Sequence, residues 1–142
     1  MENIICIVGL PGSGKSILAD QIQAYYGGLL LDDPDITQIP YTGRVVVSSP
    51  HFCLQTAQDK LLAIRKDVIW ICFENDFESC AKNAAERKKT QPEKEVIGTL
   101  HAYSKKYSFP EGHILIPVYK GDSHEAFNIV LASGVLQTQS KF

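Results

Sequence analysis

Residues 9–16 read Gly-Leu-Pro-Gly-Ser-Gly-Lys-Ser and follow directly on a short apolar run. The spacing Gly-x-x-x-x-Gly-Lys-Ser is typical of a phosphate-binding loop, or P-loop, between a strand and a helix. Gly9, Gly12 and Gly14 let the backbone wrap closely around phosphate groups, with its N–H groups pointing inward. A helix that begins near Lys15 adds the positive end of its dipole. The motif therefore predicts that the chain binds a nucleoside triphosphate.

The individual residues of the loop have separate predicted roles. Contacts to the nucleotide are expected from Gly9, Leu10, Pro11, Gly12, Ser13, Gly14, Lys15 and Ser16. Lys15 is expected to reach the β- and γ-phosphates of ATP, and the Ser16 hydroxyl is expected to ligate Mg²⁺. A glycine-rich turn without a ligand is the alternative, but a chance match to the four fixed residues has odds of about one in a few hundred in a chain of this length.

Two adjacent carboxylates, Asp32 and Asp33, follow the apolar run 29–31. Ligands of an open parallel sheet bind outside the carboxyl ends of its strands. A carboxylate at this place can orient an attacking hydroxyl or accept its proton. Asp33 is slightly favoured over Asp32 for this catalytic role. The alternative is that both are turn residues beside Pro34.

The next predicted strand ends in Ser48-Ser49, where many P-loop ATPases carry an aspartate that holds Mg²⁺. The lack of that aspartate disfavours a motor or switch ATPase more than a small kinase. In a small kinase Ser16, water and one of Asp32 and Asp33 can hold the metal.

Positive charge is concentrated in residues 82–106, which hold seven Lys or Arg against three Asp or Glu. In small kinases a lid at this place closes over the phosphates, and its arginine neutralises charge on the transferred group. Arg87 is the candidate for that role, with Lys88 and Lys89 beside it. A solvated helix end, where cations are favoured by the helix dipole, is the alternative.

The other polar and aromatic candidates are expected to be structural. His51 and His101 are each expected to be structural or exposed, and His51 is the better catalytic candidate because it lies just past a strand end. Trp70 stands in the middle of an apolar run and is expected in the core.

The elements that must position these residues alternate along the chain. Strands are predicted at 4–8, 29–31, 44–47, 68–73 and 113–119, and helices at 15–26, 54–66, from 77, at 92–107 and at 125–132. Alternating strands and helices favour a parallel sheet covered on both faces. The prediction is an α/β protein with the P-loop NTPase fold: one domain over residues 1–142, built on a doubly wound parallel five-stranded sheet.

Composition sets limits on the class of protein. The chain is 44% hydrophobic and 21% charged, with a net charge of −2, which is ordinary for a globular protein and argues against a uniformly basic surface for nucleic acid. No apolar run approaches the roughly 20 residues of a membrane span, and the N-terminus does not resemble a signal peptide. The four cysteines form no Cys-x-x-Cys pair. We therefore expect free thiols and a cytoplasmic location.

Several of these motifs together resemble the kinase domain of polynucleotide kinases, over about residues 4–119. The resemblance lies in Gly9–Ser16, in Asp32-Asp33, and in Asn83…Arg87…Pro92 before a tyrosine-rich helix. The runs 49–53 and 70–76 also look like small phage-encoded relatives. Among these are the 5-hydroxymethyluridine DNA kinases, which phosphorylate the base hydroxymethyl group within DNA as a step toward hypermodified thymidine.

The resemblance implies Lys15 and Ser16 for ATP and Mg²⁺, Asp33 or Asp32 for acceptor activation, and Arg87 for the lid. It also implies a DNA or nucleotide acceptor, and the host cytoplasm if the chain is phage-encoded. The sequence departs from the family at Ser49, where an aspartate is usual, and in having one lid arginine where two are frequent. No phosphatase domain is expected. Two alternatives remain open: a kinase of small metabolites or nucleosides, and a nucleotide-binding switch or assembly module.

Overall fold

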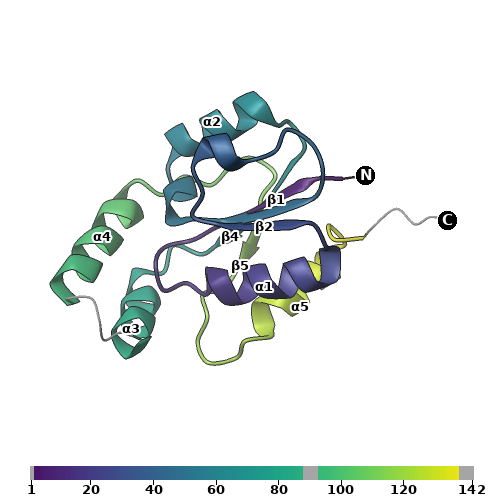
Figure 1. Cartoon of the computed structure of the whole chain (residues 1–142). Helices are drawn as coiled ribbons and strands as arrows, with labels where there is room; N and C mark the ends of the chain where they lie inside the picture. Colours follow the sequence, from purple (N-terminus) through teal and green to yellow (C-terminus); the bar gives the residue numbers. More distant parts are fainter. Residues whose placement is uncertain (1, 88–92, 138–142) are drawn as a thin grey trace.

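A single sheet of parallel strands forms the centre of the molecule, in the order β2-β3-β1-β4-β5 (Figure 1). The computed structural model describes residues 2–87 and 93–137, without the side chains of residues 87 and 93–96. The strands are β1 Ile4–Val8, β2 Leu29–Asp32, β3 Val45–Ser48, β4 Val68–Phe73 and β5 Ile114–Ile116. The predicted α/β P-loop fold with a five-stranded parallel sheet is confirmed.

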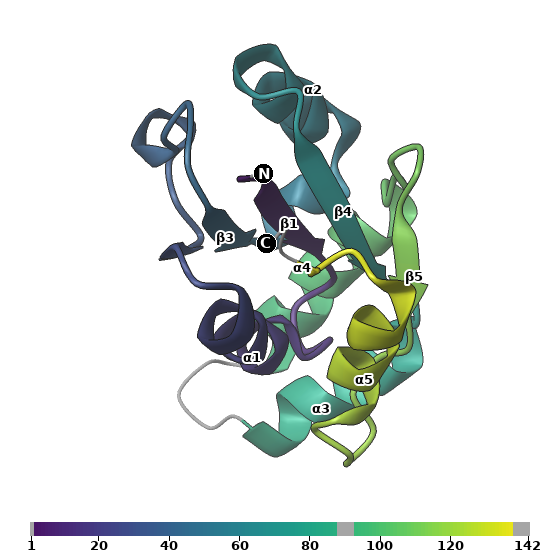
Figure 2. The same cartoon turned by 90° about the vertical axis from the view of Figure 1, so that its right-hand side faces the viewer.

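Helices cover both faces of this sheet, as predicted. The helices are α1 Lys15–Tyr26, α2 Gln55–Ile64, α3 Phe77–Arg87, α4 Glu93–Lys105 and α5 Glu125–Ser133, with the short 3₁₀ helices η1 Ile36–Gln38 and η2 Pro50–Cys53. Helices α1 and α5 lie on one face and α2 lies on the other (Figures 1 and 2). Helices α3 and α4 lie beyond the carboxyl ends of the strands (Figure 1).

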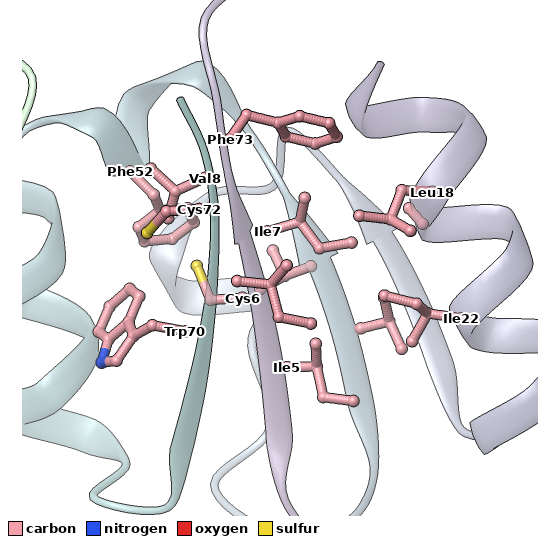
Figure 3. Close-up of a cluster of buried hydrophobic side chains, with 14 of the residues drawn as sticks. Ile5, Cys6, Ile7, Val8, Leu18, Ile22, Phe52, Trp70, Cys72 and Phe73 are labelled. Atoms are coloured by element: carbon pink, nitrogen blue, oxygen red, sulfur yellow. The ribbon is translucent and has the colours of Figure 1, made fainter. Parts of the chain in front are cut away.

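The central strand β1 is buried along its whole length, because it pairs with β3 on one side and β4 on the other. Its residues alternate between the two faces, as the period of a strand requires. Ile5 and Ile7 point toward Leu18 and Ile22 of α1, whereas Cys6 points to the opposite face, where Trp70 also lies (Figure 3). Trp70 is only 5% exposed, so its predicted place in the core is confirmed.

The boundaries of two elements differ from prediction in ways that matter for function. Strand β5 ends at Ile116 and does not continue to Tyr119, because Pro117 cannot donate to a ladder and the chain turns toward the P-loop. Helix α4 ends at Lys105, two residues before the predicted end at Tyr107. Tyr107 is thereby free to contact the carboxyl ends of β1 and β4, and Tyr119 is free to contact the P-loop.

The four cysteines are free and buried, as expected for packing residues. Burial raises the pKa of the Cys53, Cys72 and Cys80 thiols to about 12, so they stay protonated at neutral pH. A buried protonated thiol is a poor nucleophile, which excludes these three groups from thiolate chemistry. Among the described residues no helix has the length and apolar character needed to cross a bilayer.

A buried arginine joins loops at the amino ends of the strands. Arg65 is 3% exposed and donates from Nε and Nη2 to the two carboxylate oxygens of Asp67, at 3.0 and 2.6 Å. Its Nη1 also donates to the Pro40 carbonyl at 3.2 Å. The hydrogen bonds from Arg65 lower the pKa of the Asp67 carboxyl below its ordinary value of 3.8. Asp67 therefore contributes to stability in its ionised form.

We predict that Asp67→Asn lowers the free energy of unfolding by about 1 kcal/mol at pH 7, a modest loss because the Asp67 side chain is 38% exposed and partly screened. A depressed folded pKa gives stability that is present above the unfolded pKa and lost as pH falls through the folded pKa. The difference in the free energy of unfolding between wild type and variant should therefore shrink below about pH 3.8. Urea unfolding at several pH values measures it, and a difference independent of pH would contradict the assignment.

Candidate functional site

The P-loop connects β1 to α1 through two glycines with left-handed backbone conformations. Gly12 has a φ of 87° and Gly14 a φ of 109°. A Cβ on Gly12 would lie 2.5 Å from the carbonyl oxygen of Cys80 in α3, so only glycine lets the loop pack this closely. A Cβ on Gly14 would lie 3.0 Å from Cβ of Tyr119. The loop is thus wedged between α3 and the segment that follows β5.

Hydrogen bonds hold the P-loop in that position. Asn83 of α3 donates from Nδ2 to the carbonyl of Gly12 at 2.9 Å and to the carbonyl of Tyr119 at 2.7 Å. The Tyr119 amide donates to the carbonyl of Ser13 at 3.0 Å. Three segments that are far apart in sequence are joined at one side chain. The sequence pointed to Asn83 only through the family resemblance and did not predict that it supports the P-loop.

The groups that would meet phosphate fit an anionic ligand. Helix α1 has neither a side-chain cap nor an acidic residue in its first turn, so its positive end is not neutralised from within the helix. Lys15 lies over the loop and donates from Nζ to the carbonyl of Leu10 at 2.9 Å. The Ser13 hydroxyl is buried and has no hydrogen-bond partner within the described part of the chain. The loop therefore suits phosphate oxygens as acceptors.

The predicted metal ligand of the site is the hydroxyl of Ser16. Within residues 2–87 and 93–137, no group of three or more His, Cys, Asp or Glu side chains is placed to hold a metal. Ser16 is in the first turn of α1. Mg²⁺ usually keeps several waters and binds through few protein ligands together with phosphate oxygens. A hydroxyl beside bound phosphates meets that requirement.

An open hollow adjoins the P-loop. Its lining residues come from the loop, α1, α3 and the segment after β5: Gly12, Gly14, Ile17, Asn83, Glu86 and Tyr119. Ile17 is 41% exposed, which is unusual for a large aliphatic side chain and leaves an apolar wall beside the loop. The hollow adjoins the phosphate-binding loop and offers an apolar wall to a ligand bound there.

Asp32 and Asp33 lie at the carboxyl end of β2, and hydroxyl groups at the carboxyl end of β3 donate hydrogen bonds to both carboxylates. The Ser48 hydroxyl donates to Oδ1 of Asp32 at 3.3 Å, and the Ser49 hydroxyl donates to Oδ1 of Asp33 at 2.8 Å. Asp33 has a φ of 52°, a left-handed conformation that costs a non-glycine residue on the order of 1–3 kcal/mol. Ser49 stands where many P-loop ATPases carry a metal-binding aspartate. In this structure it is buried and donates a hydrogen bond to Asp33.

His51 lies closer to Asp33 than sequence reasoning anticipated. Its Nε2 is 3.9 Å from Oδ1 of Asp33, and its Nδ1 is 2.9 Å from the hydroxyl of Tyr103 in α4. The sequence signal for this contact was the position of His51 two residues after Ser49, at a strand end. No local signal pointed to Tyr103, which is 52 residues away.

Tyr107 anchors the end of the α4 segment to the sheet. Its hydroxyl contacts the Val8 carbonyl at 3.3 Å and donates to the Phe73 carbonyl, at the carboxyl ends of β1 and β4. Burial raises the pKa of Tyr107 far above its ordinary value of 10.0, so the hydroxyl keeps its proton. Sequence reasoning did not identify this residue. The contact places the start of the P-loop and the α4 segment side by side.

The three residues predicted for the lid lie at the edge of the described part of the chain or outside it. Arg87 is the last residue of α3, next to Glu86 at the hollow, but its side chain lies outside the described residues. Lys88 and Lys89 also lie outside them. The ring of His101 packs against Phe77 with centroids 4.3 Å apart, between α4 and α3.

We predict that Asn83→Ala lowers the free energy of unfolding by about 1–3 kcal/mol, because two carbonyls lose their donor. Asn83→Asp is the matched variant of nearly equal size. It should be the less stable of the two, since a carboxylate would face the carbonyl oxygens of Gly12 and Tyr119. Thermal unfolding of both variants measures this. An Asn83→Asp variant as stable as wild type would contradict the hydrogen-bond assignment.

Comparison with known proteins shows the fold. No family model and no curated protein sequence matches the chain. Among solved structures it is similar to a gluconokinase from Sinorhizobium meliloti 1021, with a TM-score of 0.70 and 18% identity over 92% of this chain and 90% of that one. It is similar to a sugar kinase from Janibacter sp. HTCC2649, with a TM-score of 0.69 and 13% identity over 98% and 100% of the two chains.

A third similar structure is Kti12 from Chaetomium thermophilum in complex with ADP-AlF3, with a TM-score of 0.61 and 14% identity over 95% of this chain and 100% of that one. These identities are all too low to carry a substrate from one protein to another. Together with the sheet order and the P-loop, the similarities show the P-loop NTPase fold.

Proposed function

We propose that this protein is an ATP-dependent kinase that transfers the γ-phosphate to a hydroxyl group, as a single domain in the cytoplasm. The observation that carries the proposal is the placement of a phosphate-binding loop and a strained, hydrogen-bonded carboxylate at the same edge of one sheet. The loop follows β1 and Asp33 follows β2, with only β3 between the two strands. The similar gluconokinase and sugar kinase structures support a kinase.

The phosphate side of the reaction belongs to the P-loop and α1. Backbone N–H groups of residues 9–16 and the helix dipole bind the phosphates, and Lys15 turns from the Leu10 carbonyl to the β- and γ-phosphates. Ser16 would hold Mg²⁺, which would neutralise charge on the phosphate oxygens. The proposed lid residue is Arg87, which would neutralise charge on the transferred group, with Lys88 and Lys89 next to it in the sequence. These residues act on the nucleotide and not on the acceptor.

The acceptor side belongs to Asp33. One carboxylate oxygen, Oδ1, accepts from Ser49, and no hydrogen bond to the other oxygen occurs among the described residues. We propose that this second oxygen takes the proton of an acceptor hydroxyl. The hydroxyl oxygen then bonds to the γ-phosphorus while the bond between the γ-phosphorus and the oxygen of ADP breaks. Asp32, whose contact with Ser48 is longer at 3.3 Å, is the second candidate.

The acceptor that we propose first is a hydroxyl of DNA or a nucleotide. This rests on the resemblance to polynucleotide kinases and on the basic segment 82–106, which could hold a polymer backbone. Within this class the best candidates are the hydroxymethyl group of 5-hydroxymethyluracil in phage DNA and a 5′-hydroxyl end. The second candidate is a small metabolite or nucleoside, favoured by the length match to a gluconokinase and a sugar kinase.

The alternative that is not a phosphotransferase is a nucleotide-binding switch or assembly module. It would need no acceptor group, so the ordered carboxylate at Asp33 argues for a kinase. An acceptor panel decides among the three: labelled ATP with 5′-hydroxyl DNA, hydroxymethyluracil DNA, nucleosides, gluconate and other sugars. Phosphate transfer to DNA should weaken with salt if the basic segment binds the backbone. Hydrolysis without transfer to any acceptor would favour the switch.

We predict that Lys15→Ala lowers kcat by more than tenfold with the best acceptor, because one lost charge contact to a transferring phosphoryl group typically costs ~10²-fold or more. The fold should stay intact, since the side chain serves the ligand and not the core. Circular dichroism provides the folding control. A variant that keeps more than about a tenth of wild-type kcat would overturn the P-loop assignment.

We predict that Asp33→Asn lowers kcat by ~10²-fold or more while the KM for ATP changes little, as expected for a group that acts on the acceptor. Asp32→Asn is the matched control and should have the smaller effect. Steady-state kinetics in both substrates makes the comparison. A loss confined to ATP affinity would make Asp33 a metal-side or structural group, and Asp32 would become the base.

A further inference from the structure

Three side chains from different parts of the sequence meet on the acceptor side of the site. Asp33 follows β2, His51 belongs to η2 and Tyr103 belongs to α4. The imidazole stands between the other two, with Nε2 3.9 Å from Oδ1 of Asp33 and Nδ1 2.9 Å from the Tyr103 hydroxyl. We infer that His51 is a positioning residue that orients the Asp33 carboxylate toward the acceptor hydroxyl, and that Tyr103 fixes the orientation of its ring. This inference rests on the proposed kinase function.

The chemistry of the three groups determines which nitrogen carries the hydrogen. Burial raises the pKa of Tyr103, which therefore stays a neutral hydroxyl at neutral pH and can donate. When it donates to Nδ1, the hydrogen of a neutral imidazole lies on Nε2. Nε2 is the nitrogen that faces Asp33, so an N–H group meets a carboxylate oxygen. The opposite tautomer would turn a lone pair toward that carboxylate, which is electrostatically unfavourable.

The contact acts on one oxygen of Asp33 only. Oδ1 already accepts from the Ser49 hydroxyl at 2.8 Å, and His51 approaches the same oxygen. The Ser49 hydrogen bond and the nearby imidazole both lie at Oδ1, which leaves the other carboxylate oxygen to the acceptor. In the reaction the acceptor proton passes to Asp33, and His51 exchanges no proton.

The distance of 3.9 Å is longer than a hydrogen bond, and the His51 and Asp33 side chains are 61% and 59% exposed. Contacts of this kind in a ligand-free site often tighten in the complex with substrate. Binding of an acceptor over Asp33 excludes water from the pair, which strengthens the attraction between an N–H group and a carboxylate. His51 therefore matters more in the transition state than in the free protein.

The test compares His51→Ala with His51→Gln in wild-type and Asp33→Asn backgrounds. The glutamine amide nitrogen can reach the place of Nε2 and donates without titrating. With the acceptor found in the panel, His51→Ala should lower kcat by about tenfold or more, as for loss of a hydrogen bond to a charged group, and should leave the KM for ATP unchanged. His51→Gln should recover most of that loss. In the Asp33→Asn background His51→Ala should have almost no further effect.

A second measurement does not depend on phosphate transfer. Nitrogen-15 NMR of the wild-type imidazole should show the hydrogen of neutral His51 on Nε2, and Tyr103→Phe should reduce that preference. A hydrogen found mainly on Nδ1 overturns the inference whether or not the protein is a kinase. Equal losses from His51→Ala in both backgrounds, or no recovery with His51→Gln, overturn it in an active kinase. A wild-type protein that phosphorylates nothing overturns the proposed function itself and the positioning role with it.

Discussion

The parallel pairing of β1 with both β3 and β4 is the constraint on which the rest of the structure depends. Parallel strands end at the same edge of a sheet, so the loops that leave β1, β2 and β3 are brought together there. The pairing requires β1 to be apolar on both faces, and all five of its residues are buried. The P-loop leaves from the centre of the sheet, and Asp33 and Ser49 leave from the strands to one side of it.

The loop that leaves β1 has no strand ladder to support it and depends on tertiary contacts. Asn83 and Tyr119 hold it from one side, through hydrogen bonds to the carbonyls of Gly12 and Ser13. Tyr107 bonds to the last carbonyl of β1 from the other side. Such contacts fix where the amide groups point before a ligand arrives. A preorganised loop of this kind loses less conformational entropy when phosphate binds.

The proposed acceptor side depends on polar side-chain contacts to Asp33, a residue with an uncommon backbone conformation. Asp33 adopts a left-handed conformation, which is uncommon for residues other than glycine, and its carboxylate accepts a hydrogen bond from Ser49 and lies 3.9 Å from His51. Through Tyr103 the same contacts reach α4, which lies beyond the carboxyl ends of the strands (Figure 1). The geometry of the proposed base is therefore linked to the position of a helix that lies far along the chain from it.

The amino-acid sequence by itself determined the fold class, the order of the elements and the P-loop, because these depend on local patterns. Apolar runs of strand length, glycines at fixed spacing and the lysine at 15 can be recognised within a few residues of one another. The sequence also indicated the carboxylates at the end of β2. It favoured Asp33 only slightly over Asp32, because the two residues are adjacent in the sequence.

Only the tertiary structure decided which polar side chains meet at the edge of the sheet. The φ of Asp33, the donor role of Ser49 and the contact between His51 and Tyr103 depend on how β2, η2 and α4 pack against each other. Asn83 and Tyr107 act through hydrogen bonds to carbonyls 71 and 99 residues away, which no local pattern records. Side-chain partners over such distances are set by the path of the folded backbone. Residue type and spacing along the chain do not specify them.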